Sequence, residues 1–90
     1  MNKYLVEFLG TMFFVFVIFV TEHWLAIGAA VGIAVLLGGM VSLVAFNPAV
    51  VFAFYAAGKL PKSDVLPYII AEILGALAAF YAYKRFVNKA

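Results

Sequence analysis

Cysteine is missing from the 90-residue sequence, and charged side chains make up only 11% of it. An ordinary soluble domain has about a quarter of its residues charged. The missing cysteine excludes disulfides and thiolate metal sites. Six Lys and Arg against four Asp and Glu leave a net charge of +2 without a basic run, so no nucleic-acid partner is expected. The one histidine, His23, completes neither a metal cluster nor a triad, so we expect no cofactor, no metal and no enzymatic activity.

Hydrophobic residues, in contrast, make up 69% of the chain. The mean hydropathy is +1.18, which leaves no room for a water-soluble domain. Three stretches approach the length of about 20 apolar residues that crosses a bilayer: Tyr4 to Thr21, Leu25 to Val41 and Val65 to Tyr83. The sequence therefore predicts an all-α, multi-pass integral membrane protein with three transmembrane helices, without indicating which membrane contains it.

A fourth apolar stretch, 45–58, is too short to cross. Asn47 is a favourable N-cap, Pro48 suits the first helical position, and Gly58 suits the left-handed residue after a helix end. A helix over about 47–57 would be about 15 Å long, half the hydrocarbon thickness. Irregular backbone at that depth must be covered by protein or face a cavity. The pattern predicts a re-entrant half-helix that returns to the side from which it came.

Small residues occur at spacings that allow helices to approach closely in lipid. Gly28 and Gly32 are four residues apart in the second span, and Gly75 lies between Ala71 and Ala79 in the third. By itself this spacing is a weak indication of helix packing. Together with Gly10 of the first span, these glycines are the candidate packing positions.

The sequence Phe46-Asn47-Pro48-Ala49-Val50 contains an Asn-Pro-Ala box. Val6 to Thr11 resembles the start of the first span of the aquaporins and glycerol facilitators, the major intrinsic protein family, and Leu66 to Ala76 resembles the third. The resemblance covers nearly the whole chain in order. Family members have six spans built from two inverted halves, each with one such box. The resemblance therefore implies an aquaporin-like half with Asn47, Pro48 and Ala49 at a pore.

The resemblance implies a passive channel for water or small uncharged solutes. The missing half would be a second, inverted copy, because a single chain is expected to leave 42–46 and Asn47 uncovered in lipid. Four such pores side by side would make an octamer. Basic residues near the span ends are balanced, which is compatible with insertion in both directions: Lys3, Lys59 and Lys62 on one side, Lys84, Arg85 and Lys89 on the other.

The resemblance also assigns roles inside the half. Glu7 is expected to brace the re-entrant loop by accepting backbone hydrogen bonds, and Glu72 stands where glutamine is more usual. The filter positions correspond to Ile27, Val35, Val44 and Val50. They include no arginine or histidine, so the filter should be apolar and water specificity does not follow.

Two other functions remain open at this point. The chain would be a small dual-topology transporter if protonation of Glu7 or Glu72 drove solute movement. It would be an assembly module if it formed half of a heteromeric pore or did not conduct.

Overall fold

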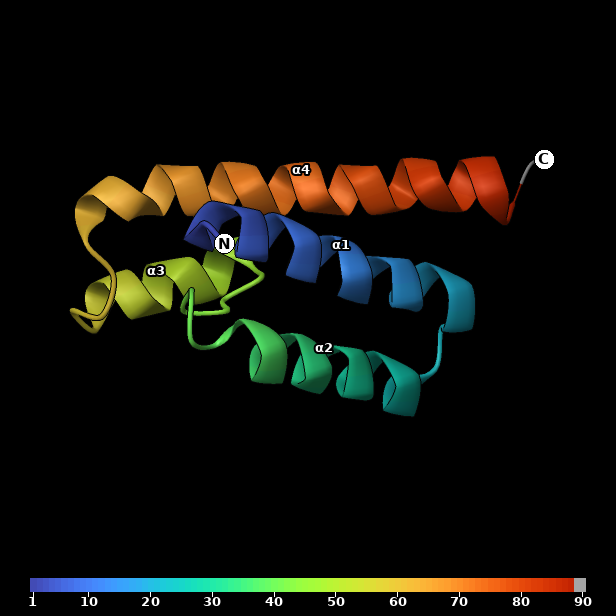
Figure 1. Cartoon of the computed structure of the whole chain (residues 1–90), viewed down its shortest axis with the longest axis horizontal. Coiled ribbons are helices and arrows are strands. Elements are labelled where there is room, and N and C mark those ends of the chain that lie inside the picture. Colours follow the sequence, from blue (N-terminus) through green and yellow to red (C-terminus); the bar gives the residue numbers. More distant parts are fainter. Residues whose placement is uncertain (89–90) are drawn as a thin grey trace.

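The computed structural model describes residues 1–88, and in this part of the chain all regular structure is helical (Figure 1). The helices are α1 (Lys3–Thr21), α2 (Trp24–Gly38), α3 (Pro48–Ala56) and α4 (Lys62–Phe86). The bundle measures 43 × 23 × 23 Å, and its long dimension is close to the thickness of a bilayer with its headgroups, about 40–45 Å. Lys89, counted in the charge balance, lies outside the described residues.

Helix α1 lies between α2 and α4, and α3 packs on the first half of α4 (Figure 1). α1 and α4 run in the same direction. Lys3 and Asp64 are paired where the two helices begin, and Phe19 stacks on Tyr83 near where they end. Both helices are long and apolar enough to cross a membrane, with 19 and 25 residues.

Local sequence explains the break between α1 and α2. Glu22 takes a left-handed conformation with φ of 49° and donates its N–H to the carbonyl of Ile18. His23 then caps α2, because its Nδ1 atom accepts the N–H of Leu25 at 3.2 Å. The polar pair at 22 and 23 ends one helix and starts the next.

The second predicted span is shorter than the sequence suggested. α2 ends at Gly38 rather than at Val41, and its 15 residues extend about 22 Å. The consecutive glycines Gly38 and Gly39 explain the early end, since glycine stabilises a helix less than other residues do. The N–H groups of Val41 and Ser42 both bond to the Gly38 carbonyl and form the turn that leaves the helix.

The glycines differ in what surrounds them. A Cβ atom on Gly75 would collide with the carbonyl oxygen of Phe8, so α1 and α4 meet backbone to backbone at this point. Gly10 lies against the ring of Phe46. Gly28 and Gly32 have no described neighbour within 4 Å of the place where their side chains would begin, so they pack against no other described helix.

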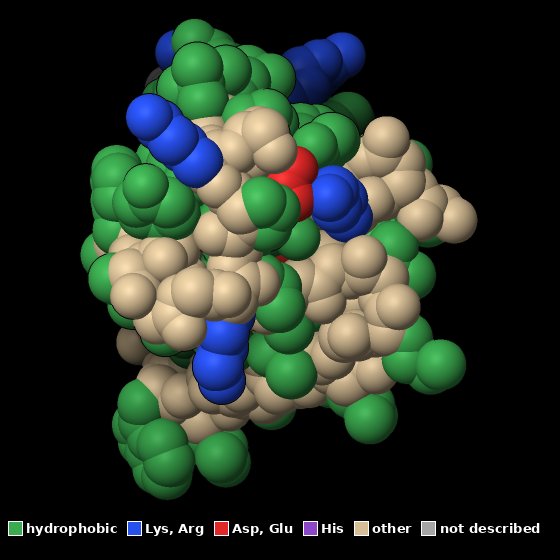
Figure 2. All heavy atoms as spheres, turned by 90° about the vertical axis from the view of Figure 1, so that its left-hand side faces the viewer, with side chains coloured by type: hydrophobic (Ala, Val, Ile, Leu, Met, Phe, Trp, Pro, Cys, Tyr) green, Lys and Arg blue, Asp and Glu red, His purple; other side chains and the backbone are tan. Residues whose placement is uncertain are grey.

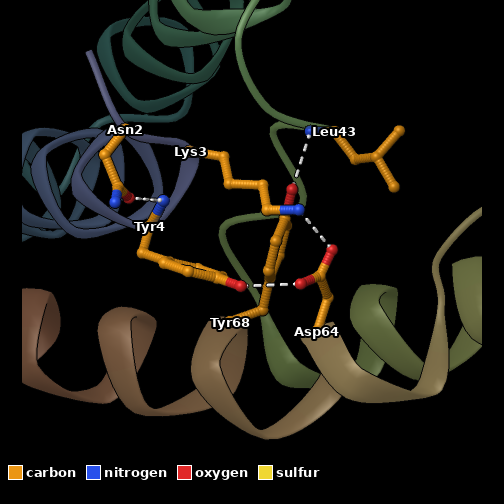
Figure 3. Close-up of polar contacts among 6 residues, drawn as sticks. All are labelled: Asn2, Lys3, Tyr4, Leu43, Asp64 and Tyr68. Carbon is orange, nitrogen blue, oxygen red and sulfur yellow. Dashed lines mark hydrogen bonds and ion pairs between the residues drawn. The ribbon is translucent and has the colours of Figure 1, made fainter.

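A polar cluster ties together the end of the molecule at which α1 and α4 begin (Figure 3). Asp64 accepts a hydrogen bond from the Lys3 Nζ atom at 2.6 Å and another from the Tyr4 hydroxyl at 2.7 Å. Figure 2 shows this end, where lysine side chains project between hydrophobic ones and a carboxylate lies beside one of them. The rings of Tyr4 and Tyr68 meet edge to face with centroids 5.9 Å apart.

Candidate functional site

The Asn-Pro-Ala box forms the start of α3. Asn47 is the N-cap with φ −155° and ψ 128°, and its side-chain oxygen accepts the N–H of Ala49 at 2.8 Å. Pro48 occupies the first turn, where its missing N–H leaves no intrahelical bond unmade. Gly58 has φ of 76° and ends the segment after Ala57. The cap uses the oxygen of the Asn47 amide, so the NH₂ group remains to donate to something else.

Segment 39–47, which connects α2 to α3, is held by the side chain of Glu7 on α1. The carboxylate accepts the N–H of Phe46 at 2.9 Å on one oxygen. Its other oxygen accepts the N–H of Ala45 at 3.2 Å and the hydroxyl of Ser42 at 2.7 Å. Glu7 is completely buried. These bonds join α1 to residues 35 to 39 positions away in the sequence.

The expectation that a single chain leaves 42–46 uncovered is wrong for most of this segment. Ser42, Ala45 and Phe46 are buried within the chain, since their polar atoms bond to Glu7 and the Phe46 ring covers Gly10. Asn47, however, is exposed. The chain thus covers most of its own loop, whereas Asn47 at the start of α3 stays exposed.

The loop reaches this arrangement through an uncommon backbone. Val44 has φ of 47° and Phe46 has φ of 55°, both left-handed and costly for bulky residues. The N–H groups of Ala45 and Phe46 both bond to the Glu7 carboxyl group, and these bonds offset the strain.

Three further side chains hold the loop, and the sequence analysis did not single them out. Ser42 accepts the N–H of Val44 at 2.8 Å, Tyr68 accepts the N–H of Leu43 at 3.3 Å, and the Thr11 hydroxyl approaches the Phe46 carbonyl at 3.5 Å. A signal was present for Thr11, which lies four residues after Glu7 and therefore on the same helix face. For Tyr68 no local pattern indicates the contact.

Glu72 is the second buried acid, with 1% of its surface exposed. Among the described residues, neither of its carboxyl oxygens has a hydrogen-bond partner. Its carboxyl lies beside that of Glu7, across the close contact of α4 with α1 at Gly75. It also lines a cavity of about 140 Å³ together with Thr11, Phe46 and Asn47. The two glutamates singled out from the sequence are thus brought together beneath the Asn-Pro-Ala box.

The four filter candidates do not close a ring in this chain. Val35 and Val50 are 41% and 37% exposed, and Ile27 and Val44 are half-buried. α2 and α3 make no contact with one another, so the described residues form no enclosed pore. Ile27 and Val35 lie on α2, Val50 lies on α3 three residues after the exposed Asn47, and Val44 lies in segment 39–47 between them.

Comparison with known proteins gives a consistent family assignment. The model of the family described as "Major intrinsic protein" matches residues 1–90. The chain is 41% identical to the glycerol uptake facilitator protein-like 6 of Lactiplantibacillus plantarum over 98% of its own length and 45% of that protein. It is 41% identical to aquaporin AqpM of Methanothermobacter thermautotrophicus over 67% of its length and 26% of that protein.

A third relative is aquaporin Z of Brucella melitensis, which is 36% identical over 88% of the chain and 41% of the relative. The chain therefore spans less than half the length of each of these relatives. No solved structure matches it. The family consists of integral membrane proteins rather than enzymes, in agreement with the two helices that can cross a membrane. The match over the whole chain and the three relatives establish that this protein belongs to the major intrinsic protein family.

Proposed function

We propose that the chain is half of a passive membrane channel for water or small uncharged solutes, and that a second, inverted copy completes the pore. Membership of the major intrinsic protein family supports the channel, and the names of the relatives refer to aquaporins and glycerol uptake facilitators. The single observation that carries the proposal is the exposed Asn47 amide at the start of the short helix α3. Glu7 holds this helix end in place because it accepts the N–H of Phe46, the residue before Asn47.

The short helix suits a re-entrant segment. α3 has nine residues, about 14 Å, which is half of a hydrocarbon core about 30 Å thick. In Figure 1 the chain leaves α2, turns inward, and α3 then runs outward to the end where α4 begins. In a membrane the tip at Asn47 would lie near the midplane, and the positive end of the helix dipole would disfavour cations there.

Asn47 supplies the chemistry for contact with a solute. Its amide oxygen accepts the N–H of Ala49, which leaves the NH₂ group to donate to a passing water or hydroxyl oxygen. The surrounding filter candidates, Val35 and Val50 among them, carry no charge and no donor. Such a lining favours neutral solutes and does not distinguish water from a small alcohol.

An inverted copy would cover what one chain leaves open. Among the described helices, α2 packs on α1 alone. The positions of Gly28 and Gly32 face open space, although glycine spacing of this kind allows close helix contact. The relatives are more than twice as long as the part that matches, which leaves space for a second half of equal size. Four such dimeric pores would form an octamer by analogy with the usual assembly of the family.

Light scattering after rapid mixing tests conduction in proteoliposomes under an osmotic gradient. Water or glycerol permeability should exceed that of empty vesicles and should fall to that level in Asn47→Trp, where the indole fills the tip. Leu66→Trp is the matched control, because Leu66 is 64% exposed on α4 and away from the tip. Permeability equal to that of empty vesicles, or equal in both variants and the wild type, would reject the channel. Transport that saturates with solute would favour a carrier instead.

A further inference from the structure

Two buried acids lie next to each other, and among the described residues no basic side chain is paired with either of them. Glu7 on α1 and Glu72 on α4 have 0% and 1% of their surfaces exposed. They are neighbours across the close contact of the two helices, where a Cβ atom on Gly75, three residues after Glu72, would collide with the carbonyl of Phe8, the residue after Glu7. Two carboxylates this close in a water-poor site cannot both remain ionised, because their charges repel and neither is hydrated. Something positive must lie between them, and the smallest candidate is a proton.

The hydrogen bonds decide which acid is ionised. Glu7 receives donors on both oxygens, from the N–H groups of Ala45 and Phe46 and from the Ser42 hydroxyl. Donors stabilise the charged form, so Glu7 is the carboxylate. No described residue donates a hydrogen bond to either oxygen of Glu72, an environment that favours the neutral acid. A neutral carboxylic acid carries an O–H donor, and the Glu7 carboxylate is the acceptor within reach.

Among the described residues, the basic side chains on the surrounding elements are paired elsewhere or exposed. On α1 the nearest basic residue, Lys3, is already paired with Asp64 at 2.6 Å. On α4 the neighbouring titratable group is Tyr68, whose oxygen accepts the N–H of Leu43. The only titratable side chain of α3, Tyr55, is 42% exposed, and segment 39–47 contains none. α2 has no titratable side chain either, so no described cation competes for the position between the two acids.

We propose that Glu7 and Glu72 form a proton-binding site in which Glu72 is a neutral acid that donates its O–H to the Glu7 carboxylate. The bound proton links Glu72 on α4 to Glu7, the acid that holds segment 39–47. Since this segment ends at Asn47, the proton also helps to position the start of α3. Removing the proton would place a second negative charge beside Glu7, and the repulsion would drive α1 and α4 apart. The site does not depend on whether the chain conducts.

Infrared spectroscopy of the 90-residue chain in lipid tests the site directly, since a protonated carboxyl has a C=O stretching band that a carboxylate lacks. The wild type should show this band at pH 7, shifted in D₂O and lost on titration to high pH. Glu72→Gln should abolish it. Glu22→Gln is the matched control, because Glu22 is an exposed acid at the end of α1, and it should leave the band unchanged.

Thermal unfolding provides the second measurement. The folded chain holds a proton that the exposed acid of the unfolded chain has already released at pH 7, so stability must fall as the pH rises. The unfolding temperature of the wild type should therefore decrease from pH 7 to 10 more than that of Glu72→Gln. A wild type without the band at pH 7, a band that persists in Glu72→Gln, or stabilisation by Na⁺ or K⁺ that Glu72→Gln removes would overturn the proposal. Should Glu72→Gln fail to fold, the wild-type titration alone decides.

Discussion

The carboxylate of Glu7 on α1 accepts the backbone N–H of Phe46, the residue just before the Asn-Pro-Ala box, at 2.9 Å. One side chain in the first turns of the protein thus fixes the position of a helix tip that lies 40 residues later in the chain. The N–H groups of this strained loop find an acceptor in Glu7 without the help of water. The loop is therefore held in one conformation and supports Asn47.

Glu7→Gln should weaken this support. The substitution replaces one accepting oxygen by an NH₂ group that faces backbone donors, which should reduce the free energy of unfolding by about 1–3 kcal/mol. Circular dichroism during heating in detergent micelles measures the effect. Glu22→Gln, at an exposed acid, is the control and should change stability by less than about 0.5 kcal/mol. Equal stability of the two variants would contradict the role of Glu7.

Gly75→Ala should disrupt the contact between α1 and α4. The added methyl group would overlap the carbonyl of Phe8, and backbone cannot move aside as a flexible side chain can. Overpacking of this kind costs about 1–3 kcal/mol, measured as a lower unfolding temperature.

Gly28→Ala is the matched control for Gly75→Ala, since the added methyl group on α2 would meet none of the described residues. The unfolding temperature of Gly28→Ala should match that of the wild type. Cross-linking in lipid should nevertheless show fewer dimers if this face of α2 meets a second copy. A Gly28→Ala variant as unstable as Gly75→Ala would show that the spacing around the two glycines is not as described.

Asp64→Ala should destabilise the protein more than Lys3→Met does. The Asp64 side chain is 8% exposed and receives two hydrogen bonds, from Lys3 and from Tyr4, whereas the Lys3 side chain is 41% exposed. Loss of the buried acceptor should cost about 1–3 kcal/mol and loss of the exposed lysine below about 1 kcal/mol. Chemical or thermal unfolding of both variants, with Lys62→Met as the control, measures the difference. The reverse order would show that the lysine contributes more than the tyrosine contact.

Single cysteines should be labelled from both sides of the membrane if the chain inserts in two orientations. The wild type has no cysteine, so Ser63→Cys and Val87→Cys each add one thiol without changing the balance of basic residues. These positions lie at opposite ends of α4. A membrane-impermeant maleimide applied to sealed vesicles should label about half of each variant. Complete labelling of one position and none of the other would exclude the antiparallel homodimer.

Local sequence was enough to predict where α3 begins and ends. Asn47 caps the helix with its own side chain, Pro48 suits the first turn, and Gly58 accepts the left-handed conformation, all through interactions within a few residues. The family could also be inferred from the sequence, because the Asn-Pro-Ala box and the flanking segments are contiguous strings. The end of α2 was predicted three residues too late, since hydropathy continues to Val41 although the helix stops at Gly38.

Contacts between distant residues could not be derived from such patterns. The sequence and its resemblance suggested a brace at Glu7, but the burial of Ser42, Ala45 and Phe46 within one chain depends on α1 lying beside the loop. The meeting of Glu7 with Glu72 likewise depends on the close, glycine-mediated packing of α1 on α4. Charge and hydropathy determine that these segments enter a membrane, whereas helix packing determines which polar groups find partners there, because partners far apart in sequence are chosen by geometry alone.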